Sequence, residues 1–74
     1  MSRLIRMDGM GHTLMAEWTA DDPGSVEAAV AAFRTELDRG YYAVISKGEG
    51  QAEQVREFPL HAPVVILRRP IAGG

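Results

Sequence analysis

A chain of 74 residues with 46% hydrophobic and 24% charged residues has the composition of one small folded domain, which excludes a long disordered or coiled-coil protein. Eight basic and ten acidic residues leave a formal charge of −2, without the basic surface of a nucleic-acid-binding protein. The absence of cysteine excludes disulfides, thiolate nucleophiles and thiolate zinc sites. No stretch has the pattern of a signal peptide or a membrane span, so we expect a cytoplasmic protein that binds neither nucleic acid nor membranes.

Residues 3–7 and 13–18 are predicted to form two strands. The first contains closely spaced apolar residues, and in the second Leu14, Ala16 and Trp18 alternate with their neighbours. The segment between the strands contains an Asp-Gly pair and a second glycine, which are residues that adopt the positive φ angles of hairpin turns. The sequence therefore begins with a strand, a turn and a strand.

A helix is predicted from residue 23 to residue 39. Asp22 has the residue type of an N-cap, Pro23 suits the first helical position, and Gly40 follows the last turn. The charged residues along this segment, Glu36 among them, are predicted to lie on a solvated face. Apolar residues at spacings of three and four form one stripe that faces a core: Val26, Ala29, Val30, Phe33 and Leu37.

The remaining segments predict three strands, at residues 41–46, more weakly at 53–58, and at 64–67. The run "VVIL" of the last strand is apolar without alternation, which is typical of a central strand. We therefore expect an α+β fold of order ββαββ(β), with one helix on one face of a small mixed sheet. A central last strand parallel to the first would make this fold a β-grasp. Residues 1–68 are predicted to form the domain, and residues 69–74 a flexible tail.

Catalytic groups are not evident in this sequence. His12 and His61 are expected at the surface, without the further ligands of a metal site. Residues 46–51 contain two glycines and a lysine, but the lysine precedes the glycines, so we interpret them as a hairpin loop and not as a phosphate-binding loop. Ser25 has no recognisable base beside it. The chain is therefore predicted to have no catalytic residue, no metal and no enzymatic activity of its own.

The end of the chain, "VVILRRPIAGG", together with the order of elements, resembles ubiquitin-like β-grasp proteins, in particular the prokaryotic sulfur carriers of the molybdopterin synthase small-subunit type. In those carriers the last strand continues into a Pro-Pro-apolar-small-Gly-Gly ending. Arg69 stands in place of the first proline. The rest of the pattern is matched by Pro70, Ile71, Ala72, Gly73 and Gly74. A bacterial ubiquitin-like protein modifier is an equally suitable relative.

The resemblance implies that an ATP-dependent activating enzyme adenylates the carboxylate of Gly74, while Gly73 keeps the tail narrow. A sulfur donor would then produce a thiocarboxylate, or a partner cysteine a thioester, so sulfur transfer and protein conjugation are both open. The partner enzyme uses the ATP, and the chain itself needs no cofactor. The implied partners are the activating enzyme and a sulfur acceptor enzyme or an isopeptidase.

Partner contacts are predicted at the tail and on an apolar patch. Alternate side chains of strand 64–67 face opposite sides and a helix covers only one, so we expect Val65 and Leu67, with Leu4, to be exposed unless segment 47–62 covers them. The arginines either contact an acidic groove or are solvated flanking charges. The tail contacts are assigned to Arg68, Arg69, Pro70, Ile71 and Ala72. The alternative function is a non-catalytic interaction module or a small structural subunit, for example of phage origin, with an incidental Gly-Gly end.

Overall fold

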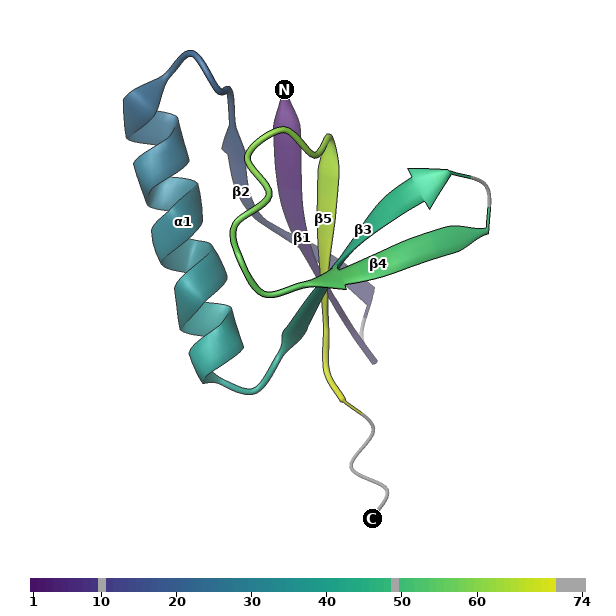
Figure 1. Ribbon diagram of the computed structural model, residues 1–74. Helices are drawn as coiled ribbons and strands as arrows, with labels where there is room; N and C mark the ends of the chain where they lie inside the picture. Colours follow the sequence, from purple (N-terminus) through teal and green to yellow (C-terminus); the bar gives the residue numbers. More distant parts are fainter. Residues whose placement is uncertain (10, 49, 71–74) are drawn as a thin grey trace.

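The computed structural model describes residues 1–9, 11–48 and 50–70, which form one helix and five strands (Figure 1). The chain is thus an α+β protein, and its elements follow the predicted order. In chain order they are β1 (Ser2–Asp8), β2 (Gly11–Trp18), α1 (Pro23–Asp38), β3 (Tyr42–Gly48), β4 (Gln51–Val55) and β5 (Val64–Arg68).

All five strands belong to one mixed sheet with the order β2-β1-β5-β3-β4. Strand β5 pairs in parallel with β1 and antiparallel with β3, so it lies at the centre of the sheet. Its central position confirms the prediction from the uninterrupted apolar run, because a strand with two neighbours and a covered face needs little polar surface. Strands β2 and β4 form the two edges.

Strand β4 differs from its predicted range, since it spans Gln51–Val55 and not 53–58. Pairing with β3 begins at Gln51, directly after Gly50, whose φ of 70° is a conformation that glycine adopts without strain. The chain leaves the sheet after Val55 because Phe58 packs against aromatic side chains of the core, 4.7 Å from Trp18 between ring centroids. The strand therefore ends at Val55: residues 56–58 form no backbone pairs with β3, and Phe58 packs against aromatic side chains instead.

Helix α1 begins at the predicted residue, Pro23, and ends at Asp38, one residue before the predicted end, with Arg39 as its C-cap. The side chain of Asp22 accepts hydrogen bonds from the backbone N–H groups of Gly24 at 3.2 Å and Ser25 at 3.4 Å, which confirms it as the N-cap. At the other end Gly40 has a φ of 98°, a conformation that strains any residue with a Cβ. Both ends are therefore specified locally.

Replacing the cap is expected to have a measurable effect. Asp22→Ala should lower the free energy of unfolding by about 1 kcal/mol, because two helical N–H groups lose their side-chain acceptor. Urea unfolding followed by circular dichroism measures this loss. Asp21→Ala removes the same charge one residue earlier and serves as the control, and equal losses in both variants would contradict the capping role.

The core lies between α1 and one face of the sheet. Its fully buried apolar residues come from every strand except β4, and from the helix: Leu4, Trp18, Ala29, Phe33, Ala43, Val65 and Leu67. The segment between β4 and β5 closes the remaining side, where Phe58 packs against Phe33 at 5.5 Å and the indole Nε1–H of Trp18 donates to the carbonyl of Leu60 at 2.9 Å. This segment therefore lies on the same side of the sheet as α1, and the opposite face is left uncovered.

Candidate functional site

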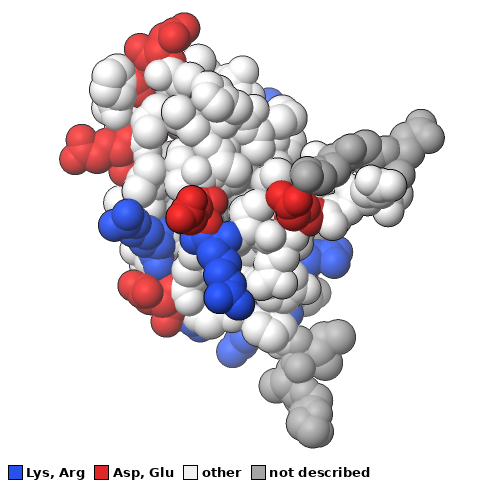
Figure 2. All heavy atoms as spheres, in the orientation of Figure 1, with Lys and Arg blue, Asp and Glu red and all other residues white. Residues whose placement is uncertain are grey.

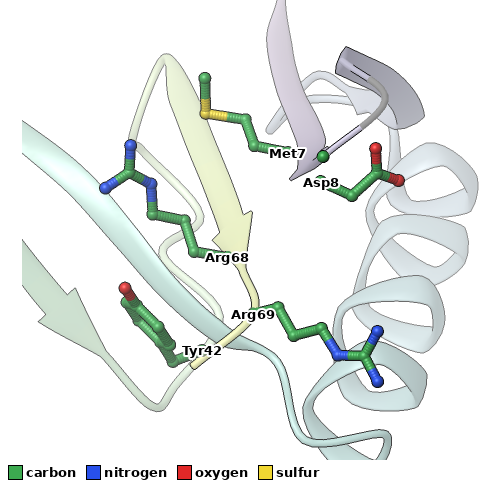
Figure 3. Close-up of a pocket in the computed structure, with 6 residues that line it drawn as sticks. Met7, Asp8, Tyr42, Arg68 and Arg69 are labelled. Atoms are coloured by element: carbon green, nitrogen blue, oxygen red, sulfur yellow. The ribbon is translucent and has the colours of Figure 1, made fainter. Parts of the chain in front are cut away.

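The carboxyl ends of β1 and β5 lie at the same end of the sheet because the two strands are parallel (Figure 1). Strand β3 begins at this end, since Tyr42 pairs with Arg68. A cavity of about 410 Å³ opens here, lined by the residues Met7, Asp8, Gly9, Tyr42, Arg68 and Arg69 (Figure 3). Arg68 and Arg69, two of the residues that were predicted to contact a partner, therefore line this cavity.

Two arginines, Arg68 and Arg69, lie at the end of β5, and among the described residues that line the cavity Asp8 is the one acidic residue. Arg68, the last residue of β5, has Met7 as its partner on one side and Tyr42 on the other. The side chains of Arg68 and Arg69 are exposed, and Figure 3 shows their guanidinium groups pointing in different directions from the end of the strand. A protein that approached the tail would meet a cation on either side of it.

The tail itself is described only at its beginning. Pro70 is exposed and has no regular secondary structure. The predicted site residues Ile71, Ala72, Gly73 and Gly74 lie outside the described residues.

The predicted apolar patch is on the wrong face. Leu4, Val65 and Leu67 are each 0% exposed, because their side of the sheet is the side that α1 and segment 56–63 cover. Alternation along β5 divides its side chains correctly into two sets, but it does not show which set the helix covers. These three residues belong to the core, and their side chains are not accessible to a partner.

An apolar row does cross the opposite face of the sheet. Four residues are successive cross-strand partners on β2, β1, β5 and β3, and none of them packs against the core. Leu14 is 53% exposed, and a hollow of about 290 Å³ borders the other end of the row. We call this feature the outer row: Leu14, Ile5, Ile66 and Val44. Such a row on an exposed face is typical of a contact surface.

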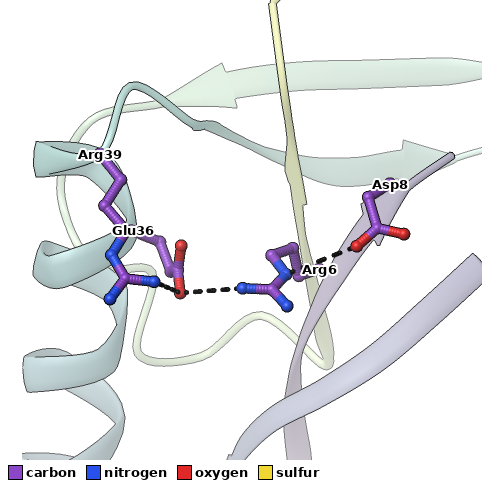
Figure 4. A network of polar contacts seen from close by, with 4 residues as sticks. All are labelled: Arg6, Asp8, Glu36 and Arg39. Carbon is purple, nitrogen blue, oxygen red and sulfur yellow. Dashed lines mark hydrogen bonds and ion pairs between the residues drawn. The ribbon is translucent and has the colours of Figure 1, made fainter. Parts of the chain in front are cut away.

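Sequence reasoning also misplaced Glu36, which is 2% exposed although it was predicted to be solvated. Its carboxylate Oε1 lies 3.4 Å from Nη1 of Arg6 on β1 and 3.7 Å from Nη1 of Arg39 (Figure 4). The signal that was available is its position: it lies three residues after Phe33, on the edge of the apolar stripe.

The described surface carries charges of both signs. Figure 2 shows Lys and Arg side chains interspersed with Asp and Glu on one face of the molecule, without a continuous area of either sign. His12 and His61 are exposed as predicted. Within residues 1–9, 11–48 and 50–70, no three His, Asp or Glu side chains are placed to hold a metal ion.

The helix that the structure describes is not long and apolar enough to cross a bilayer. Comparison with protein-family models, with curated proteins and with solved structures found no match to the chain.

Proposed function

We propose that this chain is a carrier or modifier protein of the β-grasp type, whose terminal glycine is activated by a partner enzyme. One observation carries the proposal: the central strand β5 ends at exposed Arg68, and the sequence continues directly into Pro-Ile-Ala-Gly-Gly. The order of the strands supports it as well, because the last strand lies beside the first and runs parallel to it after a helical crossover.

The position of β5 suits a tail that must be presented to an enzyme. Backbone pairing with β1 and β3 holds the strand on both sides as far as Arg68, so the root of the tail has a fixed place relative to the body. Glycines without Cβ atoms then let the backbone pass through a channel too narrow for other residues. A rigid body and a narrow end are what this function requires of the carrier.

The chemistry would use the carboxylate of Gly74 and ATP bound by the partner. A carboxylate oxygen attacks the α-phosphorus of ATP, pyrophosphate leaves, and the acyl-adenylate is a mixed anhydride that nucleophiles attack readily. A sulfur nucleophile then forms a bond with the carbonyl carbon and AMP leaves, which gives a thiocarboxylate or a thioester. The carrier contributes no acid, base or metal to either step.

Removing the two glycines tests the proposal. A chain that ends at Ala72 should lose ATP–pyrophosphate exchange completely when it is mixed with an adenylating enzyme that supports exchange with the full chain. Its thermal unfolding should not change, because the strands and the core end before residue 69. Arg56→Ala, at an exposed site beyond β4, is the control and should retain exchange. Undiminished exchange by the shortened chain would disprove the proposal.

The outer row favours one rival, a non-catalytic interaction module. In that case a partner binds the uncovered face of the sheet and the tail is irrelevant. Ile66→Glu should then abolish binding of the partner, whereas a chain shortened to Arg69 should bind as well as the full chain. Isothermal titration of both variants with the same partner distinguishes the two functions.

A further inference from the structure

The apolar pattern of β1 does not account for the face that this strand turns toward the core. Leu4 and Arg6 pair with the core residues of β5 and therefore lie on the inner side, whereas Ile5 and Met7 lie on the outer side. Hydrophobicity alone favours the reverse, because the outer pair contains two apolar residues and the inner pair only one. A shift of one residue would exchange the two sets.

The neighbouring strand already accommodates an offset of one residue at this point. The pairing of β1 with β2 shifts between Leu4 and Ile5, which face Ala16 and Leu14 respectively, so that Met15 is the extra residue of a bulge. The hydrogen-bond ladder with β2 therefore does not by itself exclude a slipped arrangement of β1. Another contact has to select the observed register.

The charged side chain on the inner side of β1 has a specific partner. Glu36 on α1 is 2% exposed, and its Oε1 lies 3.4 Å from Nη1 of Arg6, the shorter of its two contacts with arginines. Figure 4 shows the two side chains pointing toward each other. The Arg6 guanidinium also lies 5.9 Å from the centre of the Tyr41 ring and 3.9 Å from a carboxylate oxygen of Asp8. Arg39 reaches the same carboxylate, but its side chain is 63% exposed.

The ion pair between Arg6 and Glu36 leaves some of its polar atoms without hydrogen bonds. Such a pair is better suited to selecting one register of β1 than to adding stability. Among the residues that the structure describes, Glu36 Oε2 and Arg6 Nε are buried atoms with no hydrogen-bond partner. Buried ion pairs with imperfect hydrogen bonding add little net stability, because desolvation offsets their attraction. Loss of one partner, however, strands a buried charge at high cost. In a slipped register Arg6 would point outward, and of the two arginine contacts that Glu36 makes now, only that with the exposed Arg39 would remain.

We propose that the Arg6–Glu36 pair is a register lock, which forces β1 to bury Leu4 and Arg6 in preference to Ile5 and Met7. The lock acts by penalising the alternative arrangement, as polar groups do at specific positions of other packed structures. The same pair also keeps Ile5 on the outer face of the sheet, where it is part of the outer row. The assignment is independent of the proposed function, since it concerns the fold alone.

The test removes both charges together, in the double variant Arg6→Met with Glu36→Leu. We expect this variant to stay folded, with a urea midpoint equal to or above that of the natural chain, and to lose its single register. In nuclear magnetic resonance spectra the amides of β1 and β5 should give two sets of signals. In one set the cross-strand contacts of Val65 should come from Ile5 in place of Leu4.

Two further results decide the matter. Adding Ile5→Thr and Met7→Thr to the double variant makes the apolar pattern itself select the natural register, so a single set of signals should return. A double variant that shows only the natural contacts would overturn the lock, and so would one that fails to fold, because the pair would then be needed for stability. A second set of signals that persists after the threonine substitutions would also overturn it.

Discussion

Replacing Phe33 with alanine is expected to remove a large part of the stability of this domain. Phe33 is 2% exposed, lies at the centre of the buried face of α1, and packs edge-on against Phe58. Loss of a buried phenylalanine side chain costs about 3–5 kcal/mol, through lost transfer free energy and the cavity that remains. A domain of 74 residues typically has about 4–11 kcal/mol of stability in total.

Urea unfolding followed by the fluorescence of Trp18, the single tryptophan, measures the effect. Its indole is buried beside Phe58 and hydrogen-bonded to Leu60, so its emission reports the loss of the core. Phe33→Leu keeps most of the volume and should cost less than half as much. A loss below about 1 kcal/mol in the alanine variant would show that the core does not depend on this contact.

Reversing the charges at the root of the tail is expected to lower activation by the partner enzyme about 100-fold. If the proposed activating enzyme binds these arginines in an acidic groove, Arg68→Glu with Arg69→Glu would turn two attractive contacts into repulsive ones. The cost would be several kcal/mol, and about 1.4 kcal/mol is a factor of ten. The value of kcat/KM for ATP–pyrophosphate exchange measures this change. The fold should be unaffected because both side chains are exposed.

A matched control separates the position of the charges from their number. Arg34→Glu with Arg56→Glu alters the net charge equally, at exposed sites on α1 and beyond β4. Only the variant at the tail should lose activity, and the loss should diminish at high salt, where charged contacts are screened. Equal losses in both variants would assign the effect to net charge and contradict a groove at the tail.

The features that sequence predicted correctly are those with a local cause. Asp22 and Gly40 mark the ends of α1 because capping and positive φ depend on one or two residues. The central position of β5 follows from its unbroken apolar run. Each of these signals is contained within a few consecutive positions.

The features that were missed depend on contacts between distant segments. Whether Val65 or Ile66 faces α1 is decided by the placement of the whole helix, which alternation along one strand does not contain. Glu36 is buried because Arg6 is turned toward it from β1, and a helical pattern alone gives no sign of such a partner. Phe58 likewise lies outside β4, although it was predicted to be in that strand, because it packs against Trp18, which is far away in the sequence.

The parallel pairing of β1 with β5 has a consequence for the order of folding. It joins the first and last strands of the domain, in pairs such as Arg3 with Val64. Contacts between such distant residues form slowly, because a long loop must close before they provide any stability. During synthesis β1 cannot pair with β5 until β5 has been made, so the core is completed only when nearly all of the domain has left the ribosome. Every folded copy of the domain therefore already contains Arg68, the last residue of β5.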